Sequence, residues 1–304
     1  MLPLVEPWSE CPACGVETPR RALHVTRNRK SPLVNGPYYA VIGCEQCGLT
    51  YISPRPTPAA LQRYYTDEDR DGWTVRHNET IAGAKREKKT RLAARAVAPV
   101  LGARGQGRAL DIGCGAGDIL NVLKDAGWET VGVEPHAALA TIAAQRHQLV
   151  AEVPREPTFD LVVMHHVLEH VLSPRDLLRG ARAAAVTGAH LLVGVPAFED
   201  AAISGNIARA CGPIHINGFT RAALCNAASM AGWSVVSPSG APVMSGSHIL
   251  YAVADEPHTP EPRALDAAVD VLREYGRRLD RAGDFMPGPR HEGPTRESSS
   301  YRTG

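Results

Sequence analysis

The stretch ALDIGCGAGDIL, residues 109–120, decides the fold of this 304-residue chain. It reads as a short apolar strand, a turn with Gly113, Gly115 and Gly117, and the start of an amphipathic helix. Glycines let the backbone approach a ligand closely, and the first N–H groups of a helix have no partner within it. Glu134 ends the next apolar run, at a position where an acid can bind both hydroxyls of a ribose. The stretch therefore predicts a nucleotide-type site after the first strand of a sheet.

The strand, turn and helix around the glycines begin an alternation of strands and helices that continues along the chain. Short apolar runs alternate with helix-forming stretches from residue 107 onward, which is typical of a doubly wound, mostly parallel sheet. The last two runs, in WSVVSPSG and HILYAVADE, have no helix between them, so we expect them to form an antiparallel closing pair. The fold class is therefore α/β, with helices on both faces of a Rossmann-like sheet. The expected helices are 117–126, 136–147, 174–186 and 220–231.

Two cysteine pairs near the N-terminus predict a metal site. The chain has seven cysteines, and Cys11, Cys14, Cys44 and Cys47 form two C-x2-C knuckles. Two such knuckles can place four thiolates around one zinc ion, whereas an odd cysteine count suits a disulfide framework poorly. A small segment with little core also needs such a staple. We expect a structural zinc ion, because four cysteine ligands leave no open coordination position.

Composition shifts divide the chain into four predicted parts. A four-cysteine zinc module occupies 1–56, a helical linker or lid 57–106, the main domain 107–255, and a C-terminal helix with a disordered tail 256–304. Within the second part, Thr57 is expected to cap a short helix, and a helix over 79–101 is expected either to pack on the sheet or to cover its pocket. The helix expected in the last part spans 262–281.

Bulk composition limits the classes of function. Hydrophobic residues make up 44% of the chain and charged residues 21%, which indicates a globular protein. No apolar run is long enough to span a bilayer and the start does not resemble a signal peptide, so we expect a cytoplasmic protein with no membrane partner. The net charge is +1, divided between +7 in residues 1–110 and −6 in the remainder. The basic front could meet an anionic partner or form a solvated helix face, and nucleic acid is not the expected partner.

The glycine turn distinguishes two kinds of nucleotide site. A dinucleotide fingerprint requires G-x-G-x-x-G, and its sixth position here is Asp118. The pattern D-x-G-x-G-x-G instead resembles the first motif of class I S-adenosylmethionine (SAM)-dependent methyltransferases, which have a seven-stranded sheet. The resemblance implies that the turn carries the methionine end of SAM and that Glu134 carries the ribose. The implied cofactor-binding residues are Asp111, Gly113, Cys114, Gly115, Gly117, Glu134, Pro135 and His165.

The segment FDLVVMHHVLEHVLSP, residues 159–174, resembles the fourth strand and following turn of small-molecule methyltransferases. Three interpretations remain open. His166 or His170 is a general base, since an imidazole pKa near 6.5 suits that role. Alternatively, if the turn is helical, His166, Glu169 and His170 share a face and bind a divalent ion. The segment resembles the ubiquinone-type O-methyltransferases in this respect, although they carry an acid in place of His166. In the third interpretation the cluster is structural.

The segment GPIHINGFT, residues 212–220, resembles the loop before the last helix of such enzymes. The resemblance makes His215 a candidate to face the substrate, and Thr220 is the expected N-cap of the helix. Together with the cysteine knuckles, these motifs resemble bacterial methyltransferases of sugars and other natural products that carry an N-terminal zinc ribbon. The implied catalytic candidates are His166, His170 and His215.

The resemblance leaves the acceptor open. A small molecule, either anionic or linked to a carrier, is the expected substrate, and the oligomeric state is left open. Two alternatives remain: an rRNA methyltransferase that uses the ribbon to bind RNA, and a non-catalytic adaptor that binds SAM. The near-neutral net charge argues against the first alternative, and the intact glycine motif with Glu134 argues against the second.

Overall fold

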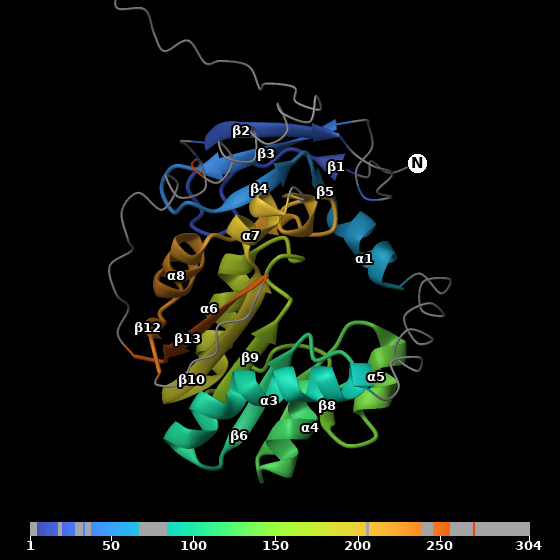
Figure 1. The fold of residues 1–304 in the computed structure, drawn as a ribbon, viewed down its shortest axis with the longest axis vertical. Helices are drawn as coiled ribbons and strands as arrows, with labels where there is room; N and C mark the ends of the chain where they lie inside the picture. The colour runs from blue at the N-terminus through green and yellow to red at the C-terminus, as the bar shows by residue number, and fades with distance from the viewer. Residues whose placement is uncertain are drawn as a thin grey trace, which may run out of the picture.

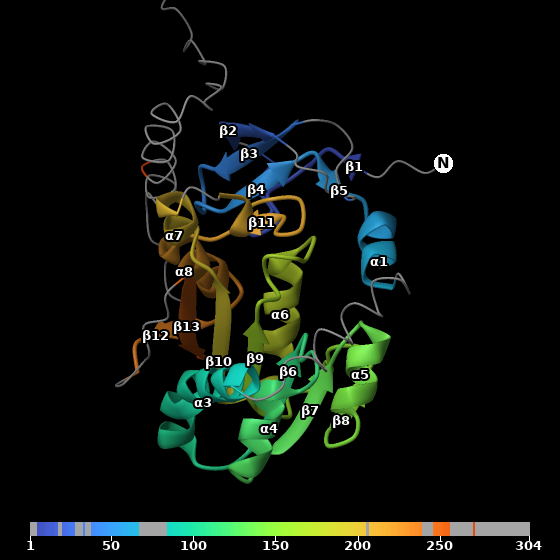
Figure 2. The same ribbon diagram turned by 45° about the vertical axis from the view of Figure 1, so that its right-hand side comes forward.

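The computed structural model describes residues 5–17, 20–27, 33, 38–66, 84–204, 207–238, 246–255 and 270. A large sheet with helices on both faces forms the main body, and a small antiparallel sheet lies at one end of it (Figures 1 and 2).

The large sheet has seven strands among the described residues. They are β6 (Arg108–Ile112), β7 (Glu129–Val133), β8 (Gln148–Val150), β9 (Phe159–His165), β10 (Ala185–Pro196), β12 (Ser234–Val236) and β13 (Ser247–Val253). Their order is β12-β13-β10-β9-β6-β7-β8, and all neighbours from β10 to β8 are parallel. Strand β13 runs antiparallel to both β10 and β12. The predicted seven-stranded, mostly parallel sheet with an antiparallel closing pair is confirmed.

Helices connect these strands, close to the predicted positions. They are α3 (Ala84–Arg104), α4 (Asp118–Asp125), α5 (Ala137–Ala143), α6 (Pro174–Ala184) and α8 (Arg221–Met230). The predictions that α5 reaches 147 and α6 reaches 186 are wrong. After Ala143 the chain tightens into a turn, and Ala185 already pairs with Phe159 in the sheet.

The alternation of side chains along β9 explains why both faces of the sheet are covered. Leu161 and Val163 pack with α3 and α4, whereas Val162 and Met164 pack with α6 and α8. Successive side chains of a strand point to opposite faces, so a strand buried on both faces reads as one continuous apolar run. Helix α3 therefore covers the sheet, and the Tyr251 hydroxyl at the sheet edge donates to its backbone at Ala96 over 2.7 Å. Residues 79–83 of the predicted helix lie outside the described residues.

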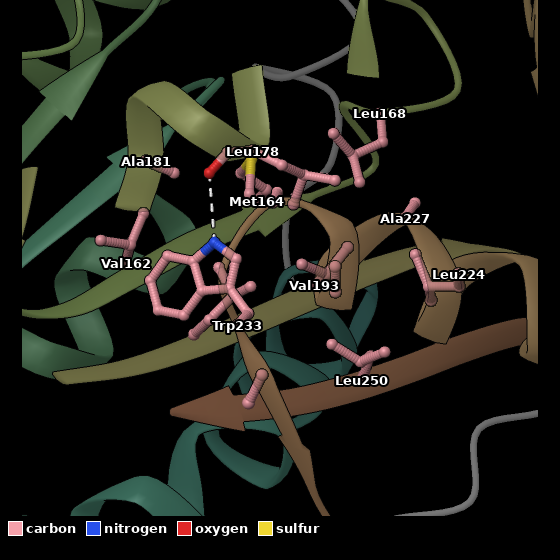
Figure 3. Packing of buried hydrophobic residues seen from close by; sticks show 14 of the residues in the cluster. Val162, Met164, Leu168, Leu178, Ala181, Val193, Leu224, Ala227, Trp233 and Leu250 are labelled. Atoms are coloured by element: carbon pink, nitrogen blue, oxygen red, sulfur yellow. Dashed lines mark hydrogen bonds between the residues drawn. The ribbon is translucent and has the colours of Figure 1, made fainter. Parts of the chain in front are cut away.

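The core on the α6 and α8 face is built around Trp233 (Figure 3). The indole is fully buried, and its Nε1 donates to the Leu178 carbonyl of α6 over 3.1 Å. A buried indole needs such a partner for its polar nitrogen. Met164 and Val193 of the sheet and Leu224 of α8 lie around it. Trp233 thereby ties the end of α8 to α6 across the sheet face.

The small sheet combines distant parts of the chain. Its strands are β2 (Arg20–Arg27), β3 (Tyr38–Cys44), β4 (Thr50–Ser53) and β11 (Asn217–Gly218), in the order β11-β4-β3-β2. A two-stranded ribbon, β1 (Val5–Glu6) and β5 (Arg55–Pro56), accompanies it. Strand β11 joins this sheet from outside the predicted module 1–56. The hydrophobic core continues from the cysteine knuckles into the main sheet without a break.

Three short helices complete the described structure: α1 (Pro58–Thr66), α7 (Phe198–Ile203) and the 3-10 helix η1 (Ile207–Arg209). The expected cap of α1 is present, since the Thr57 hydroxyl accepts from the N–H of Ala60 over 3.2 Å. The predicted helix over 262–281 and the tail after it fall outside the described residues, Asp270 excepted. None of the helices in the described part has both the length and the apolar content that crossing a membrane requires.

Candidate active site

The glycine turn after β6 has the open backbone that its sequence predicts. Gly113, Gly115 and Gly117 adopt φ values of 73°, 56° and 87°, the left-handed region that favours glycine. The N–H of Gly113 donates to the Val133 carbonyl of β7 over 2.7 Å, which fixes the turn against the neighbouring strand. A side chain added at Gly115 would meet nothing within 4 Å, so open space lies in front of that residue. The turn is a cradle for a ligand.

Two acids flank the cradle. Glu134 follows β7 and accepts from the N–H of Gly115 and the N–H of His136, each over 2.8 Å. Asp111 ends β6 and is buried, so burial raises its pKa well above the ordinary value, with the charge of Glu134 adding to the effect. Glu134 thus spans the crevice between the first two strands, at the carboxyl ends where open α/β sheets bind ligands.

The other predicted cofactor residues also lie at this sheet edge. Cys114 is buried inside the turn, and burial raises the pKa of its thiol. Pro135 is exposed directly after Glu134. His165 ends β9, and burial and the neighbouring His166 lower its pKa to about 4, which keeps its imidazole neutral near pH 7.

The turn after β9 does not have a helical backbone at His166. His166 has φ 59°, a left-handed conformation that is uncommon for a residue other than glycine. Its N–H donates to the Gly194 carbonyl over 2.8 Å. The condition for a shared helical face from His166 to His170 is therefore not met. Such a held conformation is a recurrent property of functional sites.

Glu169 is the buried centre of a histidine cluster. Its Oε1 lies 3.0 Å from Nδ1 of His166 and 3.7 Å from Nε2 of His170. Its Oε2 is buried, and among the residues that the structure describes no hydrogen-bond partner reaches it. Burial alone would raise the pKa of Glu169, but the hydrogen bond with His166 and the nearby His170 and His215 lower it. Glu169 is thus held as a buried carboxylate.

His170 and His215 face each other with their tautomers set by the backbone. The Nδ1 of His170 lies 3.1 Å from the Ile214 carbonyl, and Nδ1 of His215 contacts the Arg209 carbonyl. A carbonyl only accepts, so both Nδ1 atoms carry the proton and both Nε2 atoms keep a lone pair. The two rings lie 4.7 Å apart between centroids. Burial lowers the pKa of His170, which keeps this lone pair available at neutral pH.

The trio within metal-ligand distance differs from the predicted one. Ligand atoms of Glu169, His170 and His215 all lie within 4.8 Å of one another, whereas His166 was expected in place of His215. His215 arrives from a loop more than forty residues away in sequence, which a local motif cannot indicate.

A cavity of about 570 Å³ opens beside this cluster. It has room for a small polar molecule. Its lining comes from the ends of β10 and β13, the segment 200–209 and two of the histidines: His166, Pro196, Ala197, Asp200, Ala201, Ser204, Arg209, His215, Gly246 and Ser247.

Sequence reasoning missed Tyr65 of α1. Its ring lies 6.5 Å from His170 between centroids, and burial together with the charges of Glu169 and Glu134 raises its pKa. Tyr65 therefore lies beside the histidine cluster, where the charges of both acids act on its hydroxyl. A tyrosine in a short helix far upstream gives no signal of this placement.

The four cysteines come together in two knuckles of the same geometry. The Sγ atoms of Cys11 and Cys47 lie 3.7 Å apart, and those of Cys14 and Cys44 lie 3.6 Å apart. In each knuckle the glycine after the second cysteine has a positive φ and donates to the carbonyl of the first cysteine over 2.9 Å. Four thiolates at about 2.3 Å from one ion would lie about 3.8 Å apart, so the site fits tetrahedral zinc.

Comparison with known proteins adds two sequence relationships. A profile of the methyltransferase-domain family matches residues 82–238. The ubiquinone biosynthesis O-methyltransferase of Rhodopseudomonas palustris is 37% identical over 92 residues, which is 26% of this chain and 35% of that protein. The chain thus matches about a third of the length of that curated relative.

Solved structures similar to this chain have low sequence identity to it. Magnesium protoporphyrin IX methyltransferase from Synechocystis, determined with bound SAH, is 16% identical, with a TM-score of 0.48 over 65% of this chain and 99% of the other. A TehB-like SAM-dependent methyltransferase from Corynebacterium glutamicum is 21% identical, with a TM-score of 0.42 over 59% and 98%.

Proposed function

Because this chain belongs to the methyltransferase-domain family, we propose that it is a SAM-dependent methyltransferase that methylates a small polar molecule bound beside His166 and His215. One observation carries the proposal. The glycine cradle with Glu134 and the histidine-lined cavity lie at the same carboxyl edge of the sheet, and the charges of Glu134 and Glu169 both act on Tyr65.

The donor half would be held by the glycine turn. SAM supplies a methyl group on a positively charged sulfur, which is already a good leaving group. In this proposal Glu134 turns its carboxylate from the N–H of Gly115 toward the two hydroxyls of the ribose. Asp111, Gly113, Cys114 and Gly117 form the base of the cradle, and Pro135 and His165 border it. The chain's contribution is to hold the acceptor in line with the methyl group, with reacting atoms about 3 Å apart.

The acceptor half would handle the proton. Nε2 of His170 and Nε2 of His215 keep lone pairs toward the Glu169 carboxylate, so either can take a proton from an acceptor hydroxyl. Glu169 stabilises the imidazolium that forms, since a buried carboxylate favours a neighbouring positive charge. His166, hydrogen-bonded to Glu169 through Nδ1, presents its ring to the cavity.

A sugar or secondary-metabolite intermediate is the proposed acceptor class. The cavity supports it with polar groups from Asp200, Ser204 and Ser247, and Arg209 offers a cation to an anionic group or to a carrier linkage. The R. palustris relative acts in ubiquinone biosynthesis as an O-methyltransferase, which favours oxygen as the methylated atom.

A divalent ion is a second way in which the same cluster could orient an acceptor oxygen. The observation that favours it is the buried Oε2 of Glu169, which has no partner among the described residues, beside two Nε2 lone pairs. The ligands would be Glu169, His170 and His215. Two imidazoles and a carboxylate suit zinc or another transition metal better than magnesium. Activity that survives exhaustive chelation, with the cysteine site still loaded, would exclude this arrangement.

For the cysteine site we propose a structural zinc ion held by Cys11, Cys14, Cys44 and Cys47. The thiolate separations fit a closed tetrahedral site, which leaves no position for a substrate. Its role in the reaction is therefore indirect.

The deciding experiment is calorimetric titration of the zinc-loaded protein with SAM and with S-adenosylhomocysteine, repeated on Gly115→Arg. The added side chain has open space but fills the cradle, so micromolar binding should be lost. Gly105→Arg is a matched control, because Gly105 also has a positive φ and nothing within 4 Å but lies outside the site. A folded wild type that binds neither compound would overturn the donor half of the proposal.

The acceptor is then sought by methyl transfer to pools of anionic sugars and carrier-linked hydroxyl compounds. Activity that depends on RNA and disappears with nuclease would favour the rRNA alternative. Tight SAM binding without transfer to any pool would favour the adaptor.

A further inference from the structure

Strand β11 places the edge of the candidate active site inside the cysteine-bearing sheet. Asn217 pairs with Tyr51 of β4, and Gly218 pairs with Thr50. The Thr50 hydroxyl donates to the Gly218 carbonyl over 2.8 Å, and the Ile52 N–H donates to the Ile216 carbonyl over 3.0 Å. These hydrogen bonds fix the backbone of β11 to the cysteine-bearing sheet.

Gly218 makes this close pairing sterically feasible. A Cβ added there would lie 2.5 Å from the Thr50 hydroxyl oxygen and 2.7 Å from Cys211 Cβ. Any larger residue would push β11 away from β4. His215 lies two residues before Asn217, so its position depends on the pairing of β11 with β4.

Asn217 extends the connection to the turn after β9. Its backbone N–H donates to the Glu169 carbonyl over 3.1 Å. Its Nδ2 donates to the carbonyls of Leu168 over 3.0 Å and Val171 over 2.7 Å. The side chain is fully buried. One amide group thus fixes the carbonyls on both sides of Glu169 and His170.

The second cysteine knuckle leads directly into β4. The N–H of Cys44 donates to the Leu49 carbonyl over 2.9 Å, and Gly43 of β3 pairs with Thr50. A metal ion that orders this knuckle also orders the strand to which β11 is bonded.

We infer that Asn217 is a positioning residue that fixes Glu169, His170 and His215 relative to one another and to the cysteine-bearing sheet. It holds the Glu169–His170 turn by its side chain and His215 by its place in β11. The inference rests on the proposed function for the role of the cluster. In this inference the cysteine-bearing sheet supports the loop that carries His215 and does not act as a separate recruiting module.

The test compares Asn217→Asp with Asn226→Asp in the full-length, zinc-loaded protein. Asn217→Asp keeps the shape but replaces the two donors with a carboxylate oxygen that the Leu168 and Val171 carbonyls repel. Asn226 is a matched control, because it is also a buried asparagine. Its Nδ2 donates to the carbonyl of Cys47 over 3.2 Å. This hydrogen bond from Asn226 ends at the second cysteine knuckle.

Three measurements are made on each variant. Calorimetry measures the affinity for SAM and so tests the proposed donor site. The amount of zinc released by a thiol reagent shows whether the cysteine knuckles still hold the metal. Proton NMR titration of the imidazole Cε1–H signals of His170 and His215 reports the cluster without requiring a known acceptor. We expect Asn217→Asp to shift both titration midpoints by about 0.5 pH unit or more, with SAM affinity changed less than about twofold. Asn226→Asp should leave both midpoints in place.

Two results would overturn the inference: midpoints in Asn217→Asp equal to those of the wild type, or an equal shift in Asn226→Asp, which would mean general loosening. Asn217→Ser, which adds no charge and retains one donor, is measured alongside and should also shift both midpoints. A shift seen in Asn217→Asp alone would reflect the new carboxylate and would also overturn the inference. If Asn217→Asp does not fold, Asn217→Ser decides alone. Failure of the wild type to bind SAM would count against the proposed function, while the histidine titrations would still decide the role of Asn217.

Discussion

At the scale of single residues, Glu134 joins the two strands that form the cradle. Its two carboxylate oxygens accept from the backbone at Gly115 and at His136. The side chain of Glu134 thereby fixes the glycine turn after β6 to the residues that follow β7.

Glu134→Gln should weaken SAM binding by about tenfold to a hundredfold, because charge-assisted hydrogen bonds to a buried or half-buried group contribute about 1.5–3 kcal/mol. Stability should fall by about 1–3 kcal/mol, because the single amide oxygen can accept from only one of the two backbone N–H groups and the other is left facing the amide nitrogen. Calorimetry measures the affinity. Glu129→Gln, at the opposite end of β7 and in a solvent-exposed pair with Arg108, is the control and should bind as the wild type does. Equal affinity in both variants would remove Glu134 from the site.

His165 predicts how stability depends on pH. Its folded-state pKa is about 4, against an ordinary value of 6.5, because the ring is buried beside His166. Between these two values the unfolded chain binds a proton that the folded protein does not, so stability is lost as pH falls from about 6.5 toward 4. At pH 5 the loss from this residue is on the order of 2 kcal/mol.

Urea unfolding at pH 7.5 and pH 5.0 measures this dependence in the wild type and in His165→Gln. The variant should lose about 2 kcal/mol less than the wild type between the two pH values. An identical loss in both proteins would show that other groups carry the pH dependence.

At the scale of helices and strands, two of the three buried tryptophans in the described part of the chain, Trp128 and Trp233, differ in one hydrogen bond. Trp233 donates to Leu178 of α6, whereas Nε1 of Trp128 has no partner in the described part of the chain. Trp233→Phe should therefore destabilise the protein by about 0.5–1.5 kcal/mol more than Trp128→Phe does, because it removes a buried hydrogen bond. Trp233→Ala should cost about 3–5 kcal/mol through the cavity left between α6 and the sheet. Denaturant unfolding of the three variants measures these differences.

Elements with a strong periodic pattern were the ones that the sequence could predict. The alternation of apolar runs and amphipathic helices gave the seven-stranded sheet, and the cysteine spacing gave the knuckles, because each signal is local. Strand β11 could not be predicted from two residues, Asn217 and Gly218, whose pairing with β4 is set by contacts about 168 positions away. The left-handed His166 was missed for a related reason. Its backbone is held by Gly194 of the next strand, and only tertiary contacts keep such a conformation.

The site divides in the same way. Residues of the glycine turn and Glu134 lie where their motif places them, because turn and strand end are local features. His215 and Tyr65 reach the cluster from other elements, and nothing in their own neighbourhoods of the sequence indicates it. The predicted ligand trio therefore contained two residues of the observed trio and lacked the third.

At the scale of the whole molecule, one apolar core joins the cysteine knuckles to the main sheet. Cys11, Cys44 and Cys47 belong to the same buried cluster as Leu110 and Trp233. Removal of the proposed zinc ion should therefore destabilise the whole protein. We expect one cooperative calorimetric transition for the loaded protein and a melting temperature lower by about 10 °C or more after chelation or in Cys44→Ser.

Cys225→Ser is the control for this experiment, because Cys225 is half-buried in α8 and lies outside the four-thiolate cluster. It should melt within a few degrees of the wild type. Two separate transitions in the loaded protein, with only the first sensitive to chelation, would show that the cysteine-bearing sheet folds independently of the main sheet.

The pairing of β4 with β11 also has a consequence during synthesis on the ribosome. Thr50 leaves the exit tunnel 168 residues before Gly218, so at about 5–20 residues per second β4 waits roughly 10 to 30 seconds for its neighbour. During that interval the nascent ribbon has an open edge, and open edges recruit other extended chains. The newborn protein is thus most exposed to misassembly before its second half exists, and early metal loading and chaperone binding at this edge would protect it.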